Sequence, residues 1–174
     1  GAHVMEECRF NRTIVKDRHI VAVETNKGII ECDYFVNAGG LWARKIGQMS
    51  EPHVKIPVHP AENHFLYTRP VEGLDPMMPA IRDPDGNIFI REYNGGFLTG
   101  GFEKWAKPSF EKGDLPEGTF EREAQVDWDH FYVMLREMLH RVPIMKSAIL
   151  GQLLNSSDGF SCDGKWVLGQ SSEV

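Results

Sequence analysis

The sequence has little of what marks several common classes of protein. None of its uncharged apolar runs approaches the roughly 20 residues that a membrane-spanning helix needs, and it contains no internal repeat or low-complexity tract. Only 3 of its 174 residues are cysteines, and Cys8, Cys32 and Cys162 do not show CxxC spacing. The cysteines therefore do not predict a disulfide framework or a thiolate zinc site, and they are more typical of lone thiols in a reducing compartment.

An excess of positive charge is also missing. Lysine and arginine number 19 against 25 aspartates and glutamates, which gives a formal net charge of −6. Because nucleic-acid binding usually requires clustered basic residues, we expect neither nucleic acid nor a membrane as a partner. What is present is ordinary for a globular protein, since 41% of the residues are hydrophobic and 25% are charged.

The first fifty residues predict β structure followed by one α/β unit. We predict a strand over residues 4–10 and a hairpin of residues 19–25 and 29–32, because Asn26-Lys27-Gly28 has turn chemistry. The nearly continuous apolar run 34–37 predicts a strand covered on both faces. Gly39 and Gly40 end this strand, and residues 41–49 have helical spacing.

The rest of the chain predicts a meander and one long helix. Turn residues at 85–86 and 94–96 separate three short strand patterns, and Asp127 has the chemistry of a helix N-cap. The amphipathic pattern after it ends at Pro143. The other expected elements are a linker at 51–60, a strand at 64–68, a loop at 71–78, meander strands at 80–83, 87–93 and 97–102, an irregular segment at 104–118, a strand at 148–154, turns at 156–159 and 163–164, and a strand at 166–169.

Taken alone, the residues leave the chemistry open. Gly39-Gly40 is typical either of a turn that approaches a phosphate or ribose, or of an ordinary tight strand-to-helix turn. The glycines of 95–101 lie between strand patterns, so they predict a hairpin and not a phosphate loop.

The histidines and serines likewise assign no reaction. His53, His59 and His64, with Glu62, show no HExxH spacing, so we predict hydrogen-bonded or solvated histidines and no metal site. The chain contains no GxSxG nucleophile elbow, which leaves a hydrolase triad without support.

Several segments, in the right order, resemble one family. The run YFVNAGGLWA at 34–43 is similar to the VVNAAGxWA segment of the D-amino-acid-oxidase-like flavoproteins, the group with the sarcosine and dimethylglycine dehydrogenases. Further similar segments are GAHVME at 1–6, IRDPDGNIFIR at 81–91, GGFE at 100–103, DWDHF at 127–131 and FSCDG at 160–164. The resemblance covers essentially the whole chain.

This resemblance implies a mixed α/β fold, made of part of a Rossmann-like FAD-binding domain and an antiparallel-sheet substrate domain. Residues 1–50 would belong to the FAD-binding domain, 51–150 to the substrate domain with one long helix, and 151–174 to a strand that returns towards the FAD-binding domain. The implied cofactor is FAD, and the implied cofactor-binding residues are Phe10, Ala38, Gly39, Gly40 and Trp42. No catalytic residue is assigned, and the flavin-facing candidates are Phe65, Arg91 and Phe102.

Departures from the family pattern shape the expected function. A GxGxxG half, a flavin-linking histidine and a C-terminal glycine-rich segment are not in this chain, so we expect an internal fragment that does not bind FAD tightly by itself. Phe65 and Phe102 stand where the family often has tyrosine. Two stretches, around Thr68-Arg69-Pro70 and Gly100 to Lys104, are most similar to a non-catalytic member that regulates a mitochondrial phosphatase.

Two functions are therefore kept apart. The first is a regulatory subunit in the mitochondrial matrix whose partner is the catalytic subunit of the phosphatase. The alternative is an FAD-dependent dehydrogenase that oxidises a small amine, an N-methylated glycine. The resemblance implies for such enzymes a hydride transfer from the N-methyl carbon to the flavin.

Overall fold

The computed structural model describes residues 1–110, 115 and 125–174. The described chain divides into two compact units, built on residues 1–60 with 159–174 and on residues 61–110 with 125–158. We call them the N-terminal unit and the sheet–helix unit. Their limits lie near residues 60 and 158, and the functional assignment of the predicted domains stays a prediction.

The N-terminal unit contains a three-stranded antiparallel sheet of β1 (Phe10–Lys16), β2 (His19–Thr25) and β3 (Gly28–Glu31), in that order. The predicted hairpin is confirmed. The Thr25 hydroxyl donates to the Gly28 carbonyl at 2.8 Å and accepts from the Lys27 N–H at 3.1 Å. Gly28 has a φ of +122°, a conformation that favours glycine at this turn.

The first predicted strand is placed wrongly along the chain. The strand begins at Phe10 and continues to Lys16, whereas residues 4–9 form no strand. Glu7 has a φ of +52°, which interrupts an extended backbone, and Val4 is 84% exposed. This segment contacts the β2–β3 turn without forming a ladder: the side chains of Asn26 and Lys27 donate to the carbonyls of Glu7 at 3.1 Å and Glu6 at 2.6 Å.

The predicted buried strand at 34–37 is also wrong. These residues are outside every strand, and Tyr34 and Val36 are 83% and 80% exposed. A strand of this composition is buried when neighbouring strands and layers cover it, and within the described residues no strand pairs with it. The helix after it is confirmed: a 3₁₀ turn, η1 (Gly40–Trp42), leads into α1 (Ala43–Gln48).

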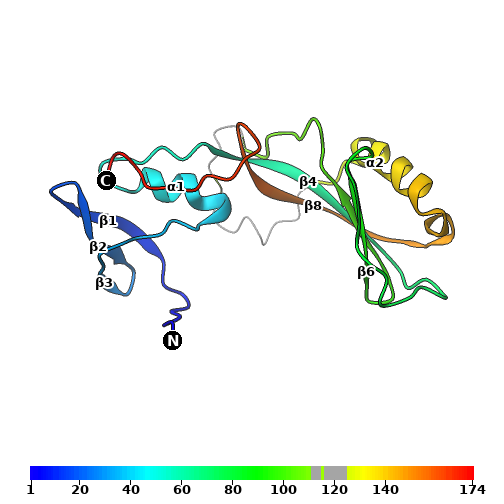
Figure 1. Ribbon diagram of the computed structural model, residues 1–174, viewed down its shortest axis with the longest axis horizontal. Coiled ribbons are helices and arrows are strands. Elements are labelled where there is room, and N and C mark those ends of the chain that lie inside the picture. Colours follow the sequence, from blue (N-terminus) through cyan, green and yellow to red (C-terminus); the bar gives the residue numbers. More distant parts are fainter. Residues whose placement is uncertain (111–114, 116–124) are drawn as a thin grey trace. The chain divides into compact units, whose positions relative to one another are not determined.

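The sheet–helix unit is built around a five-stranded sheet with the order β5-β6-β7-β4-β8 (Figure 1). Its strands are β4 (Val58–Thr68), β5 (Ile81–Asp83), β6 (Ile88–Tyr93), β7 (Gly96–Gly101) and β8 (Leu150–Ser161). The predicted meander is confirmed, since β5, β6 and β7 pair antiparallel in sequence order. The loop predicted at 71–78 is confirmed as well.

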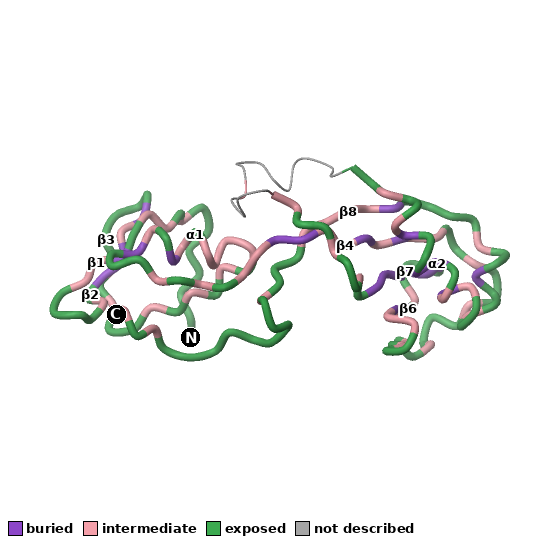
Figure 2. The backbone as a smooth tube through the Cα atoms, turned by 90° about the horizontal axis from the view of Figure 1, so that it is seen from above, coloured by how far each residue is buried: buried purple, intermediate pink, exposed green. Residues whose placement is uncertain are grey.

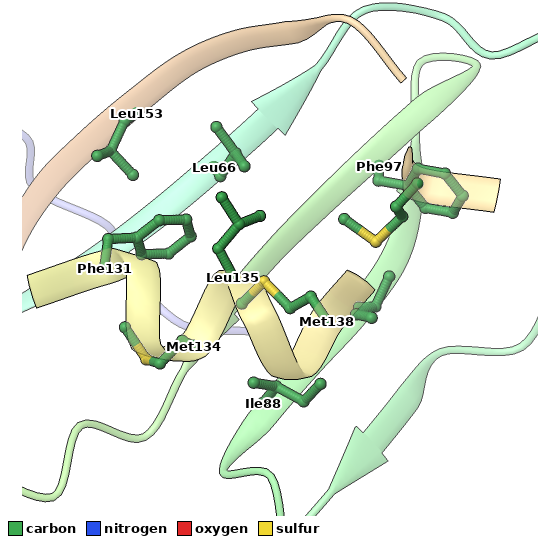
Figure 3. Packing of buried hydrophobic residues seen from close by; sticks show 10 residues of the cluster. Leu66, Ile88, Phe97, Phe131, Met134, Leu135, Met138 and Leu153 are labelled. Carbon is green, nitrogen blue, oxygen red and sulfur yellow. The ribbon is translucent and has the colours of Figure 1, made fainter. Parts of the chain in front are cut away.

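One face of this sheet is covered by α2 (Trp128–Arg141). Asp127 is its N-cap, as predicted, because its carboxylate accepts a hydrogen bond from the His130 N–H at 2.9 Å. Phe131, Leu135 and Met138 point from the helix towards the strands (Figure 3). Their strand partners include Leu66, Ile88, Ile90, Phe97 and Leu153. A 3₁₀ turn, η3 (Pro143–Ser147), follows the helix, so the predicted stop at Pro143 is confirmed.

The C-terminal part differs from the prediction at two places. The predicted turn at 156–159 lies inside β8, where side chains attach the strand to its surroundings: the Ser157 hydroxyl donates to that of Ser109 at 2.6 Å. Residues 166–169 form no strand, and Trp166 is 87% exposed. The irregular segment predicted at 104–118 lies partly outside the described residues.

Burial is concentrated in the sheet–helix unit, where buried segments follow β7 and α2 (Figure 2). Among the described residues, no helix is both long and apolar enough to cross a membrane.

Candidate functional site

Four of the five predicted cofactor-binding residues, Ala38, Gly39, Gly40 and Trp42, form an ordered turn before α1. The Asn37 side chain secures it from both ends, because it accepts from the Gly39 N–H at 3.2 Å and donates to the Ala43 carbonyl at 2.9 Å. Gly39 packs closely, since a Cβ there would lie 2.4 Å from the end of the Ile46 side chain, which would have to move. The turn is thus held by side chains on its inner side.

The outer side of the same turn presents backbone. Ala38 and Gly40 are exposed, and Gly40 has a φ of +54° with nothing within 4 Å of the position that a Cβ would take. The Trp42 N–H donates to the Gly39 carbonyl at 2.9 Å and is therefore already used. At Gly40 a planar or phosphorylated group can therefore approach the backbone to van der Waals distance.

An aromatic pair lies elsewhere in the same unit. The rings of Phe10 and Phe35 stack with centroids 5.1 Å apart and planes 10° apart. Phe10 is half-buried at the start of β1. Phe35 also precedes the glycine turn by only a few residues, so the Phe10 ring packs on the segment that leads into this turn.

In the sheet–helix unit, the face of the sheet away from α2 carries the flavin-facing candidates. In β6, Ile88 and Ile90 pack under the helix, so Phe89, Arg91 and Tyr93 face the other way. On this side, Phe89 of β6 lies between Arg82 of β5 and Gly100 of β7, and Gly100 is in turn opposite Phe65 of β4. Arg91 of β6 is opposite Leu98 of β7. We call this side of β4–β7 the open face.

Phe65, Phe89 and Phe102 form a row on the open face. The Phe89 ring centroid lies 6.0 Å from that of Phe65 and 6.1 Å from that of Phe102. The Arg82 guanidinium lies 4.3 Å from the Phe102 ring centroid, a cation–π distance. Two of the three candidates are therefore brought together through Phe89.

The third candidate, Arg91, lies further along β6. Its guanidinium is 5.3 Å from the ring centroid of Tyr93, and that ring meets Tyr67 edge-on at 5.3 Å. Arg91 is exposed. The open face thus has phenylalanines near Arg82 and tyrosines near Arg91.

Behind the open face, the structure assembles a buried cluster that sequence reasoning missed. We call His64, Glu103 and His130 the buried triad. One Glu103 oxygen, Oε1, accepts from the His64 backbone N–H at 3.0 Å and pairs with His64 Nδ1 at 2.9 Å, while Oε2 accepts a short hydrogen bond from His130 Nε2. The side chains of His64 and Glu103 are 0% and 2% exposed.

The protonation of the buried triad follows from its neighbours. The Asp127 N–H donates to His64 Nε2 at 3.3 Å, so Nδ1 carries the hydrogen that is donated to Glu103. The ligand atoms of the triad lie within 4.8 Å of one another, a spacing that could hold a metal ion. In this tautomer, however, the one lone pair of the His64 ring, on Nε2, accepts from the Asp127 N–H and is not free for a cation, so the arrangement is that of a hydrogen-bond network. The prediction that His64 is hydrogen-bonded is confirmed.

Electrostatics keep the acidic groups of this region ionised. Burial favours the neutral Glu103 carboxyl, but hydrogen bonds from His64 and His130 outweigh this effect and lower its pKa below 4.5. The Lys107 ammonium lies 2.5 Å from Asp127 and, with the His130 N–H, lowers the pKa of Asp127 to about 2. At neutral pH the region therefore holds two carboxylates and one lysine cation.

Comparisons with known proteins show the family of the chain. A family model described as DAO, FAD dependent oxidoreductase, matches residues 1–174. The mitochondrial pyruvate dehydrogenase phosphatase regulatory subunit of Mus musculus is 38% identical over 178 residues, covering 100% of this chain and 20% of that protein. The mitochondrial sarcosine dehydrogenase of Mus musculus is 30% identical over 182 residues, covering 100% of this chain and 19% of that protein.

A solved structure shows the same fold. The L-proline dehydrogenase of P. horikoshii superposes with a TM-score of 0.76 at 20% identity, covering 99% of this chain and 43% of that one. The chain therefore spans about a fifth of the length of the two relatives named above.

Proposed function

Because the chain belongs to the FAD-dependent oxidoreductase family, we propose that it is part of a flavoprotein-fold subunit that regulates pyruvate dehydrogenase phosphatase in mitochondria. The observation that carries this proposal is its 38% identity to such a regulatory subunit over all of the chain, against 30% for sarcosine dehydrogenase. The catalytic subunit of the phosphatase is the proposed partner, and the mitochondrial matrix is the proposed location.

FAD is the proposed cofactor of the complete protein. The exposed backbone at Ala38 and Gly40 supports this, because a ribose or pyrophosphate can approach it without meeting a long side chain. Gly39 and Trp42 would shape the turn, and Phe10 would pack beside the adenine. When bound, FAD supplies the capacity to accept a hydride, whereas the protein supplies position and electrostatics.

The open face supports a regulatory function more than a catalytic one. In β5, β6, β7 and the paired part of β4, the residues that register assigns to this face include no aspartate, glutamate, histidine or lysine. Phe65 and Phe102 also lack the phenol that tyrosine would bring. Oxidising an amine requires its nitrogen lone pair, and the row of phenylalanines offers no group that could take the proton from an ammonium. The phenols of this face belong to Tyr67 and Tyr93, which lie near Arg91 and outside that row.

The second candidate function is an FAD-dependent dehydrogenase of sarcosine or dimethylglycine. The observation in its favour is the match of sarcosine dehydrogenase over 100% of the chain. Under this alternative, Arg82 or Arg91 on the open face would attract the substrate carboxylate.

Dye reduction by the complete, flavin-loaded protein separates the two functions. The regulatory proposal predicts no reduction with sarcosine or dimethylglycine, together with one-to-one binding to the phosphatase catalytic subunit in calorimetry. Reduction of the dye by either amine at enzymatic rates would overturn the proposal and establish the alternative. Binding without dye reduction would support it.

A further inference from the structure

The buried triad lies directly behind the two phenylalanines of the open face. His64 precedes Phe65 in β4, and Glu103 follows Phe102 after β7. Because successive residues of an extended chain point to opposite sides, the His64–Glu103 contact ties together the two backbone segments that carry these rings. The Glu103 carboxylate accepts from both the backbone N–H and the ring of His64.

We propose that Glu103 is a positioning residue that sets, through the backbone, the placement of Phe65 and Phe102 on the open face. The segment after β7 has lost its regular pairing, since β7 ends at Gly101. Next to Phe102, the Glu103 carboxylate attaches this segment behind the sheet, and the Phe102 N–H donates to the Asn87 carbonyl at 2.7 Å. Further along, the Lys107 carbonyl accepts from the Glu62 N–H at 2.8 Å. On the other side, Phe102 is 45% exposed, so packing alone does not fix its ring.

The charge of Glu103 is essential to this role. Each of its oxygens accepts hydrogen bonds from a histidine, and the side chains of Glu103 and His64 are 2% and 0% exposed, so water cannot replace His64. The charged groups around the triad are Asp127 on the α2 side and Lys107 in the segment after β7, which pair with each other. A glutamine at 103 keeps the shape but replaces one accepting oxygen by an N–H₂ donor facing a histidine that donates.

A site-specific reporter tests this inference. We would place 4-fluorophenylalanine at position 65 or 102 of the complete protein and record ¹⁹F spectra without added flavin. Glu103→Gln is expected to move or broaden both signals. The signal of a reporter at the core residue Phe97, which is 1% exposed, is expected to keep its chemical shift and width. Asp129→Asn is the matched control. It also removes one negative charge, at an exposed position in the first turn of α2, the helix that carries His130.

The possible outcomes separate a structural role from a positioning role. Unchanged signals at 65 and 102 in a folded Glu103→Gln protein would overturn the inference, even if the variant melted at a lower temperature. Should that variant not fold, His130→Ala removes only the partly exposed partner, 22% exposed, and is expected to move the signal at 102 more than that at 65. Equal shifts, or none, would contradict the proposal.

That the two rings face a flavin rests on the proposed function. The ¹⁹F test does not depend on flavin binding. A protein that binds no FAD would refute the proposed function and leave the ¹⁹F result intact. A protein that binds FAD while the Glu103→Gln signals stay in place would refute only the inference.

Discussion

Gly100 is the residue at which the backbone makes room for the aromatic row. A Cβ at this position would lie 2.7 Å from Phe89 Cζ and 3.1 Å from the His64 carbonyl oxygen. The Phe89 ring is the contact that joins Phe65 to Phe102, so the open face depends on the absence of a side chain here.

Gly100→Ala is therefore expected to destabilise the protein by about 1–3 kcal/mol, because the added methyl group displaces the Phe89 ring or the β4 backbone. Chemical denaturation measures the change. Arg91→Lys, an exposed substitution on the same face that keeps its charge, serves as control and should stay within about 0.5 kcal/mol. A Gly100→Ala protein as stable as the control would show that the ring is not seated on this glycine.

Glu103 gives a prediction about pH. Its pKa is lower in the folded protein than its ordinary value of 4.5, so ionisation of this group stabilises the fold above that value. The stabilisation is lost as the pH falls through the lowered pKa. We expect the wild type to exceed Glu103→Gln in stability at about pH 7, and the difference to shrink at about pH 3.5.

Denaturant midpoints of both proteins at the two pH values test this prediction. The comparison isolates Glu103, because Asp83 and Asp127, whose pKa values are also lowered, titrate in both proteins. A difference that grows towards acid pH would contradict the assigned sign.

At the scale of elements, α2 stabilises the sheet through one apolar stripe. Phe131, 0% exposed, contacts the core beneath the helix, whereas the next residue, Tyr132, is 60% exposed. Phe131→Ala should cost about 3–5 kcal/mol through lost burial and a residual cavity. Tyr132→Ala, the control in the same helical turn, should stay within about 0.5 kcal/mol. Thermal or denaturant unfolding would contradict the described packing if the two variants were equally stable.

Sequence patterns predicted the elements that are stabilised by local chemistry. The turn at Asn26–Gly28, the meander and the N-cap at Asp127 follow from short-range signals, and all three are confirmed. The strand predicted at 34–37 was wrong because strand formation depends on partners that composition does not reveal. The turn predicted at 156–159 was wrong because these residues belong to the strand β8 despite their turn chemistry.

The buried triad could not have been predicted from spacing. His64, Glu103 and His130 are 39 and 27 residues apart in sequence and meet only through tertiary packing. A signal existed in the acidic residue after Gly100-Gly101-Phe102 and in the histidine three residues after the N-cap. Neither pattern indicates a partner, so register and helix placement had to be known first.

At the scale of the whole molecule, family membership rests on the match of the family model over residues 1–174. The chain supplies a glycine turn with exposed backbone and a sheet whose open face carries phenylalanines and arginines. Each feature lies within its own unit. We propose that the turn from Ala38 to Trp42 contacts FAD in the complete protein.

The flavin content of the purified complete protein, measured from its absorbance, tests this claim most directly. We expect about one flavin per wild-type chain and an occupancy lower by about tenfold or more in Ala38→Glu, because the new carboxylate would repel the pyrophosphate. Ile29→Glu, which adds the same charge at a 64% exposed site, should leave the content unchanged. A wild-type protein without flavin, or an Ala38→Glu protein that retains all of it, would contradict the account.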